Sequence, residues 1–309
     1  MKSDYIWMDG ELVSFDQAVV HFLTPTLHYG TGVFEGIRCY ETRKGPAVFR
    51  LREHLKRFLD SIKVVGIPDL AYSLTDLYRA VHLTIRANEF LECYIRPLVY
   101  MKGPLGLNLD AWEPVVGIAV WEWGPFLGKE SMENGVRVTV SSFTRHHPNV
   151  MMSKAKISGN YVNSTLAKTL ATRSGFDEAI MLDPEGYVAE CSGENLFIVR
   201  NGVIYTPPTA AILEGVTRDA VIALAGDLGI PVIEEPISRD QLYIADEVFL
   251  CGTAAEVVPV REIDFRKIGQ SNKGPVTDAI QKLFFQTVRG EGLRSPVWLD
   301  YVDETVLAV

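Results

Sequence analysis

Residues 154–168 read KAKISGNYVNSTLAK, and residues 189–197 read AECSGENLF. The first stretch places Lys154 and Lys156 just ahead of a glycine and of a run that is compatible with a helix. Most lysines lie at protein surfaces with their charge in water, so a lysine in this setting alone says little about chemistry. In an extended segment, residues two apart point to the same side, and local geometry therefore does not choose between Lys154 and Lys156.

Strand and helix patterns alternate irregularly on both sides of this stretch. A hairpin is expected over 5–20, around the turn pair Asp9-Gly10. Runs rich in β-branched and aromatic residues predict further strands at 32–41, 47–51, 91–101, 114–123, 135–143, 231–237 and 247–252. Strands are also expected around 178–190, 195–201 and 202–208, separated by turn signals at 183–186 and 201–202. Apolar spacing and capping signals predict helices at 51–65, 75–88, 160–174, 216–228 and 275–288. Because these elements follow no strict βαβ order, the fold class is α+β or mixed α/β.

One of these helices carries a specific start signal. The helix at 75–88 is expected to open with Thr75 as its cap and Asp76 as the acid of its first turn. This assignment predicts which side chain satisfies the first backbone N–H groups of the helix.

Chain length and a break in the pattern predict two domains. A chain of 309 residues exceeds what one hydrophobic core usually organises. Residues 124–134, GPFLGKESMEN, interrupt the strand pattern with two glycines and a proline. We therefore expect a smaller domain at 1–123, an interdomain loop at 124–134 and a larger domain at 135–309.

Charge and composition exclude several classes of partner. The formal net charge of -9 opposes a nucleic-acid-binding surface, which normally shows a basic excess. The start, MKSDYIWMDGELVSF, lacks the apolar core of a signal peptide, and no apolar run approaches the roughly 20 residues that span a bilayer. The four cysteines are far apart, so neither a disulfide framework nor a zinc site is expected. These features favour a cytoplasmic protein that binds no metal, membrane or nucleic acid.

Further sequence motifs accompany the stretches at 154–168 and 189–197. Lys156 precedes Tyr161 by five residues, and Glu190 opens an E-x-x-G-E-N-L-F run. Five further stretches occur in order: VFEGIRCY (33–40), REHLKR (52–57), YIRPL (94–98), LEGVTRD (213–219) and GTAAEVVPV (252–260). Together they resemble the branched-chain amino-acid aminotransferases over nearly all of the chain. These are fold-type IV pyridoxal 5′-phosphate (PLP) enzymes of the class IV aminotransferase family.

The resemblance implies a fold and a set of cofactor-binding residues. The fold is a small N-terminal α/β domain with a larger, β-barrel-like C-terminal domain that carries helices. The five-residue step to Tyr161 selects Lys156 over Lys154 as the lysine that forms the Schiff base with PLP and moves the substrate proton. Glu190 is expected to pair with the pyridine nitrogen, and Tyr161 with the phenolic oxygen. The residues expected to bind the phosphate are Arg57, Val216, Thr217 and Thr253.

The resemblance also implies how amino-acid substrates bind. Tyr94 and the backbone amide of Ala254 are expected to hold the α-carboxylate, and Arg96 the distal carboxylate of glutamate. The residues expected to form the walls for an aliphatic side chain are Tyr29, Phe34, Leu105, Leu107 and Trp123. One position departs from the pattern, because Phe126 stands where relatives commonly have tyrosine. The missing hydroxyl predicts weaker binding of glutamate and 2-oxoglutarate.

These expectations define one function and its alternatives. The expected reaction is a ping-pong transamination of L-leucine, L-isoleucine and L-valine with 2-oxoglutarate, in a homodimer or higher homo-oligomer whose loop at 103–107 completes the partner's pocket. A D-amino-acid transaminase, an (R)-amine transaminase or an aminodeoxychorismate lyase of the same fold type would share Lys156, Tyr161 and Glu190. A binding or scaffold protein on a retired enzyme fold is the alternative from another class.

Overall fold

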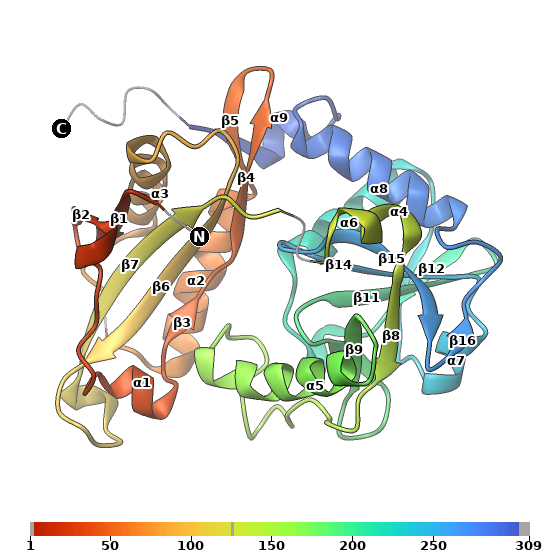
Figure 1. Cartoon of the computed structure of the whole chain (residues 1–309), viewed down its shortest axis with the longest axis horizontal. Coiled ribbons are helices and arrows are strands. Elements are labelled where there is room, and N and C mark those ends of the chain that lie inside the picture. Colours follow the sequence, from red (N-terminus) through yellow and green to blue (C-terminus); the bar gives the residue numbers. More distant parts are fainter. Residues whose placement is uncertain (1–2, 69, 125–126, 303–309) are drawn as a thin grey trace. The chain divides into compact units, whose positions relative to one another are not determined.

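Two β-sheets, each in its own compact unit, organise the computed structural model of this chain, which describes residues 3–68, 70–124 and 127–302 (Figure 1). The first unit is built from residues within 1–123, 155–160 and 287–309, and the second from residues within 124–154 and 161–286. The division drawn from the sequence kept 155–160 and 287–309 with the second domain, whereas here both segments group with the first. The mixed content of helix and sheet confirms the expected fold class.

The first unit contains a mainly antiparallel sheet in the order β17-β5-β4-β6-β7-β1-β2, with β3 paired to β6. Its strands are β1 (Tyr5–Met8), β2 (Glu11–Ser14), β3 (Val33–Phe34), β4 (Ile37–Thr42), β5 (Gly45–Phe49), β6 (Cys93–Lys102), β7 (Glu113–Trp121) and β17 (Leu299–Tyr301). Its helices are α1 (Pro25–Tyr29), α2 (Leu51–Val65), α3 (Leu74–Ala87) and α9 (Ser295–Trp298).

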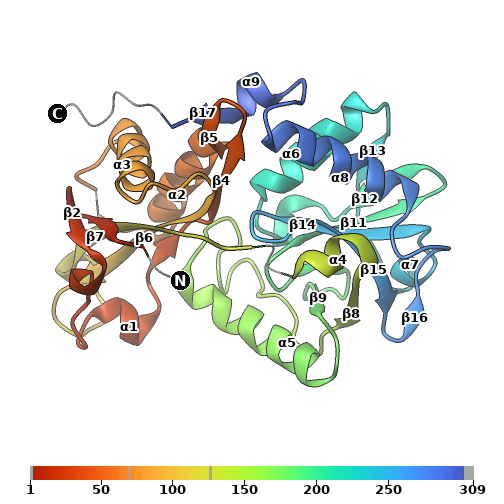
Figure 2. The ribbon, with the colours of Figure 1, turned by 45° about the horizontal axis from the view of Figure 1, so that its top comes forward.

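Helices α2 and α3 pack against this sheet and form the core of the first unit (Figure 2). The apolar spacing that predicted α2 is the spacing of its buried face, which includes Leu51, Leu55, Phe58 and Ile62. Burying such side chains contributes roughly 1.5–3 kcal/mol each. This packing fixes the helix that carries Arg57.

The start of α3 differs from the sequence-based assignment. The helix begins at Leu74, and its cap is Ser73 rather than Thr75. The Ser73 hydroxyl accepts a hydrogen bond from the backbone N–H of Asp76, and the Asp76 carboxylate accepts one from the N–H of Ser73. This reciprocal capping box satisfies two N–H groups, which a cap at Thr75 would not do.

The turn of the first hairpin agrees with the sequence-based prediction. Strands β1 and β2 pair with Met8 opposite Glu11, which leaves Asp9 and Gly10 as the two turn residues. Both have positive φ angles, +50° and +103°, as the tight primed turns of hairpins require.

The second unit contains a larger sheet in the order β10-β9-β8-β15-β14-β11-β12-β13, with β16 paired to β15. Its strands are β8 (Val136–Val140), β9 (Glu178–Leu182), β10 (Val188–Cys191), β11 (Asn195–Arg200), β12 (Val203–Thr206), β13 (Val232–Glu234), β14 (Glu247–Gly252), β15 (Glu256–Ile263) and β16 (Arg266–Lys267). The helices that follow or flank them are α4 (Lys129–Asn134), α5 (Tyr161–Arg173), α6 (Val216–Asp227), α7 (Arg239–Tyr243) and α8 (Pro275–Val288).

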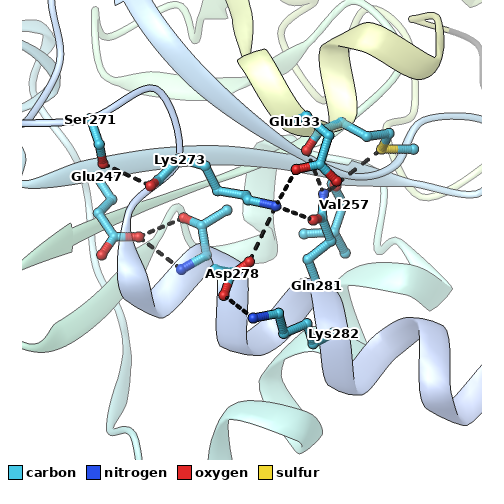
Figure 3. Close-up of polar contacts among 10 residues, drawn as sticks. Glu133, Glu247, Val257, Ser271, Lys273, Asp278, Gln281 and Lys282 are labelled. Atoms are coloured by element: carbon cyan, nitrogen blue, oxygen red, sulfur yellow. Dashed lines mark hydrogen bonds and ion pairs between the residues drawn. The ribbon is translucent and has the colours of Figure 1, made fainter.

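A polar cluster fixes the start of α8 in the second unit (Figure 3). The buried carboxylate of Glu247 accepts hydrogen bonds from the N–H of Val276 and from the N–H and hydroxyl of Thr277, at 2.7–3.0 Å. Nearby, the amine of Lys273 pairs with Glu133 at 3.1 Å and with Asp278 at 3.2 Å. An acid at a helix start satisfies its unpaired N–H groups, so Glu247 has a local structural role.

Residues 155–160 pair with the first unit along β3 and the residues before it. The N–H of Phe34 donates to the carbonyl of Lys156 at 3.1 Å, and Val33 and Ile157 form an isolated β-bridge. The N–H of Gly159 donates to the carbonyl of Gly30 at 2.9 Å. A Cβ on Gly159 would lie 3.0 Å from that carbonyl oxygen, so glycine permits this close approach.

Among the residues that the structure describes, no helix has the length and apolar character that a membrane span needs.

Candidate active site

Arg57 is held by two buried side chains that the sequence analysis did not single out. It lies on α2 and donates from Nε to Glu35 Oε1 at 2.7 Å and from Nη2 to Glu35 Oε2 at 2.9 Å. Nδ1 of His54, one turn earlier on α2, lies 2.8 Å from Glu35 Oε2. The Glu35 side chain has 0% exposure and that of Arg57 only 14%, so both charged groups are largely removed from water.

The charges in this cluster follow from burial and pairing. Burial raises the pKa of Glu35, but the charge of Arg57 and the hydrogen bond with His54 outweigh it and hold this pKa far below its ordinary value of 4.5. Burial lowers the pKa of His54 below 6.5, and the hydrogen bond with Glu35 offsets only part of this effect. At neutral pH, Glu35 is therefore ionised and His54 is neutral, so the Nδ1 proton of His54 is available to the carboxylate.

Lys156 is anchored to the same helix and strand. Its backbone N–H donates to the hydroxyl of Ser61 on α2 at 3.1 Å, and its carbonyl accepts from Phe34. Its Nζ lies 5.0 Å from the centroid of the Phe34 ring. The first unit therefore brings Lys156 and Arg57 to one helix face, because Ser61 follows Arg57 by four residues.

Lys154 has a different environment, although it is only two residues away. It lies in a turn of the second unit, so the two lysines do not share an extended strand. Its side chain is 42% exposed, and its amine pairs with Glu214 at 2.6 Å and contacts the carbonyl of Thr209. Lys154 is thus a surface cation with its own partner.

Aromatic rings surround the guanidinium of Arg96 in the first unit. Its central carbon lies 4.6 Å from the ring centroid of Phe34, 5.5 Å from that of Tyr94 and 5.8 Å from that of Trp121. Trp123 adds an edge contact to Tyr94 at 4.7 Å. Trp121 was missed by the sequence analysis, although its position two residues before Trp123 in the predicted strand 114–123 was a usable signal. Together these side chains form an apolar wall with one cation.

Two details indicate that this wall is built for a polar ligand. Within the described part of the chain, Nε of Arg96 is buried without a hydrogen-bond partner, which is costly unless a ligand or water supplies one. A Cβ on Gly36 would lie 2.0 Å from the hydroxyl oxygen of Tyr94, so glycine leaves room for that hydroxyl. Tyr94 and Arg96 therefore lie side by side at this apolar wall.

Glu190 is the centre of a second cluster, in the second unit. Nη2 of Arg145 lies 2.7 Å from Glu190 Oε1, and both side chains are less than 10% exposed. Nδ2 of Asn195 and the backbone N–H of Leu213 each donate to Oε2 at 3.3 Å. Arg145 was not anticipated, because it lies in a loop 45 residues before Glu190 and nothing local marks it.

A neighbouring acid adds little negative charge to this cluster. Burial, followed by the nearby charge of Glu178, raises the pKa of Glu194 well above its ordinary value of 4.5. Glu194 therefore keeps its proton near neutral pH. Glu190 is the carboxylate that the Arg145 guanidinium contacts directly.

The expected phosphate-binding residues of the second unit lie at a helix start and in a turn. Helix α6 begins at Val216, as predicted, with Gly215 at its cap and no side chain capping it among the described residues. Val216 and Thr217 are buried, and Thr253 lies in the turn between β14 and β15. The uncapped N–H groups of a helix start favour an anion.

The remaining expected site residues lie on separate elements, and one of them lies outside the described residues. Tyr29 stacks on Trp112 at 5.8 Å, and Leu105 and Leu107 lie on an exposed loop, with Leu107 86% exposed. Tyr161 is the first residue of α5, and Ala254 lies in the turn after β14. Phe126 lies outside the described residues. Across the described ranges, the acidic, histidine and cysteine side chains form no cluster that could hold a metal ion.

Comparisons with known proteins place this geometry in context. The family model described as Amino-transferase class IV matches residues 32–263. The chain is 48% identical over 298 residues to the branched-chain-amino-acid aminotransferase of Pseudomonas aeruginosa, covering 96% of this chain and 97% of that protein. It is 47% identical to the protein of the same name from Escherichia coli K12, covering 98% and 99%. A crystal structure of the T.th. branched-chain amino acid aminotransferase, complexed with N-(5′-phosphopyridoxyl)-L-glutamate, is similar with a TM-score of 0.94 at 48% identity, covering 98% of this chain and 100% of that one.

Proposed function

The chain belongs to the class IV aminotransferase family, and on that premise we propose that it transfers the amino group of L-leucine, L-isoleucine or L-valine to 2-oxoglutarate with PLP as cofactor. The observation that carries this proposal is the position of Phe34. Its backbone binds Lys156, and its ring faces both the Lys156 amine and the Arg96 guanidinium. The amine of Lys156 and the guanidinium of Arg96, which could bind an acidic side chain, thus both lie at the apolar ring of Phe34.

Each unit carries groups that suit part of the cofactor. Arg57 and the uncapped start of α6 suit a phosphate, and Thr253 would add its hydroxyl. Glu190, which pairs with Arg145, suits a protonated pyridine nitrogen. Tyr161 would donate to the phenolic oxygen. When bound, PLP accepts the amino group and withdraws electrons from the substrate Cα.

The side chains of this protein then supply binding and proton transfer. Lys156 takes a proton from the substrate Cα in the first half-reaction and returns a proton to Cα in the second. Tyr94 and the N–H of Ala254 bind the α-carboxylate. The apolar wall of Phe34 and Trp123 contacts the aliphatic side chain of a branched-chain substrate. Arg96 binds the distal carboxylate when glutamate is the substrate.

A panel of amino donors tests the function directly. With 2-oxoglutarate as acceptor, we expect L-leucine, L-isoleucine and L-valine to react and D-alanine and (R)-1-phenylethylamine to react poorly. Preference for a D-amino acid or an (R)-amine would identify another transaminase of the same family. A pure protein that neither absorbs near the visible range as PLP enzymes do nor reacts with any donor would support a binding role.

Phe126→Tyr is expected to lower the Michaelis constant for 2-oxoglutarate and to leave that for L-leucine nearly unchanged. The added hydroxyl would restore one hydrogen bond to a charged group, typically about 1.5–3 kcal/mol, which corresponds to roughly tenfold or more. Steady-state kinetics with each substrate varied in turn measures both constants. An equal change for both substrates would mean that residue 126 packs and does not recognise the carboxylate.

We further propose a homodimer or larger homo-oligomer in which the loop at 103–107 completes a partner's pocket. Leu105 and Leu107 are exposed here, and an apolar loop gains most by contact with another chain. Leu107→Asp is expected to shift sedimentation toward monomer and to lower kcat/KM for L-leucine about tenfold or more, since a buried leucine contributes roughly 1.5–3 kcal/mol. Ile244→Asp, at an exposed apolar site of the second unit, is the control. A fully active monomer would refute the proposal.

We also propose a cellular location and an interdomain boundary. The four cysteines are all free and buried, which supports a reducing, cytoplasmic location. The interdomain boundary at 124–134 can be tested by limited proteolysis.

A further inference from the structure

Glu35 is a wholly buried carboxylate to which no role has been assigned so far. It binds Arg57 through both oxygens and also accepts from His54 and, at 3.2 Å, from the N–H of Gly36. We propose that Glu35 is a positioning residue: with His54, it holds Arg57 in the orientation in which Arg57 binds the phosphate of the cofactor. This inference rests on the proposed function, because the phosphate belongs to PLP.

Stability alone does not account for a carboxylate at this place. Removing a carboxylate and a guanidinium from water carries a desolvation penalty that often exceeds their attraction, and apolar side chains of similar volume commonly serve a core as well or better. The two hydrogen bonds from Arg57 to the two oxygens of Glu35 form a fork, which instead fixes the plane of the guanidinium. A long arginine side chain loses much rotamer freedom when it binds an anion, and an arginine that is already oriented has less to lose.

The position of Glu35 along the chain supports this role. It follows Phe34, whose backbone binds Lys156, and it meets the face of α2 that carries His54 and Arg57. The same helix binds the backbone of Lys156 through Ser61. The contact between β3 and α2 therefore sets Arg57 relative to Lys156, and Glu35 is the charged part of that contact.

Two physical accounts of Glu35 predict opposite effects of removing its charge. With His54 neutral, the cluster of Glu35, His54 and Arg57 has no net charge. If charge alone governed phosphate binding, Glu35→Gln would leave a net positive cluster and strengthen the binding of phosphate. If orientation governs, the same substitution weakens the fork and phosphate binding becomes weaker.

The experiment measures how tightly the full-length apoprotein binds PLP and pyridoxal, which lacks the phosphate, by absorbance or fluorescence titration. Glu35→Gln is expected to weaken PLP binding about tenfold to a hundredfold and to change pyridoxal binding less than about threefold, because the fork consists of hydrogen bonds between charged groups. In an Arg57→Leu background, Glu35→Gln is expected to add no further loss, as required if the two residues act as a unit.

Two more variants keep the test decisive. His54→Phe retains the buried volume but removes the Nδ1 donor, and it is expected to lower PLP affinity by a smaller factor, about threefold to tenfold. Glu247→Gln removes another buried carboxylate, in the second unit, whose partners are backbone and hydroxyl groups at the start of α8 (Figure 3). It is the matched control, and the ratio of PLP to pyridoxal affinity should stay at the wild-type value.

The outcomes separate this inference from the proposed function. An unchanged affinity ratio or tighter PLP binding in Glu35→Gln, with the phosphate preference lost in Arg57→Leu, would overturn the positioning role alone. Equal losses for PLP and pyridoxal in both Glu35→Gln and His54→Phe would assign Glu35 to the fold and also overturn it. Wild-type protein that binds PLP no better than pyridoxal would instead contradict the proposed cofactor.

Discussion

Lys156→Ala is expected to abolish transamination while the protein keeps its fold. The substitution removes the amine that moves the substrate proton, and a positioned acid–base group alone contributes about 10²–10⁴-fold to a rate. We therefore expect the rate of amino transfer from L-leucine to 2-oxoglutarate to fall at least about 1000-fold, since the covalent link to the cofactor is lost as well. The backbone contacts of residue 156 with Ser61 and Phe34 do not involve its side chain, so thermal unfolding should change little.

Lys154→Ala is the matched control for this result. Its amine pairs with Glu214 at an exposed surface, and exposed ion pairs contribute at most about 1 kcal/mol. Its activity should remain near that of the wild type. In a separate measurement, borohydride reduction of the holoenzyme followed by peptide mapping should place the pyridoxyl group on Lys156. A pyridoxyl group on Lys154 would overturn the assignment.

Arg145→Met is expected to lower the free energy of unfolding by about 3–5 kcal/mol, the usual effect of removing one partner of a buried ion pair. Arg145 and Glu190 have side chains that are 9% and 8% exposed, with 2.7 Å between their charged atoms. Without the arginine, the Glu190 carboxylate loses its cationic partner inside a nearly dry site, where Asn195 and Leu213 still donate to it. Chemical denaturation of the apoprotein at neutral pH measures this loss without any contribution from bound cofactor.

Arg200→Met is the matched control, because it breaks an ion pair with the same separation between charged atoms in an exposed environment. Arg200 and Asp246 are also 2.7 Å apart, but their side chains are 47% and 46% exposed. Water already screens these charges, so the expected loss is within about 1 kcal/mol. Equal losses for Arg145→Met and Arg200→Met would show that burial does not govern the Arg145–Glu190 pair.

Local sequence patterns predicted the elements wherever short-range signals agreed with packing. The spacing of Leu51, Leu55 and Phe58 predicted α2, because the residues that recur every three or four positions are those that the helix buries. The limits of α8 and β14 were also predicted correctly. The start of α3 was not, because Ser73 and Asp76 cap the helix as a pair, and the prediction placed the cap at Thr75.

The candidate site could be predicted only in part. The ordered motifs identified the family, which the comparisons confirmed, and they placed Lys156, Arg57 and Glu190 among the expected residues. The partners of these residues could not be read from the same motifs. Glu35 lies 22 residues before Arg57, and Arg145 lies 45 residues before Glu190, so no local spacing connects either pair.

The sequence by itself thus determined the types of element, their order, the family and the residues that resemble its motifs. Only the tertiary structure decided that Lys156 joins the first unit while Lys154 stays in the second, and that Arg57 is buried against Glu35. The physical reason is that periodicity records how often apolar residues recur along one element. Whether a charge can be buried depends instead on the partner that a distant segment brings to it, here β3 against α2.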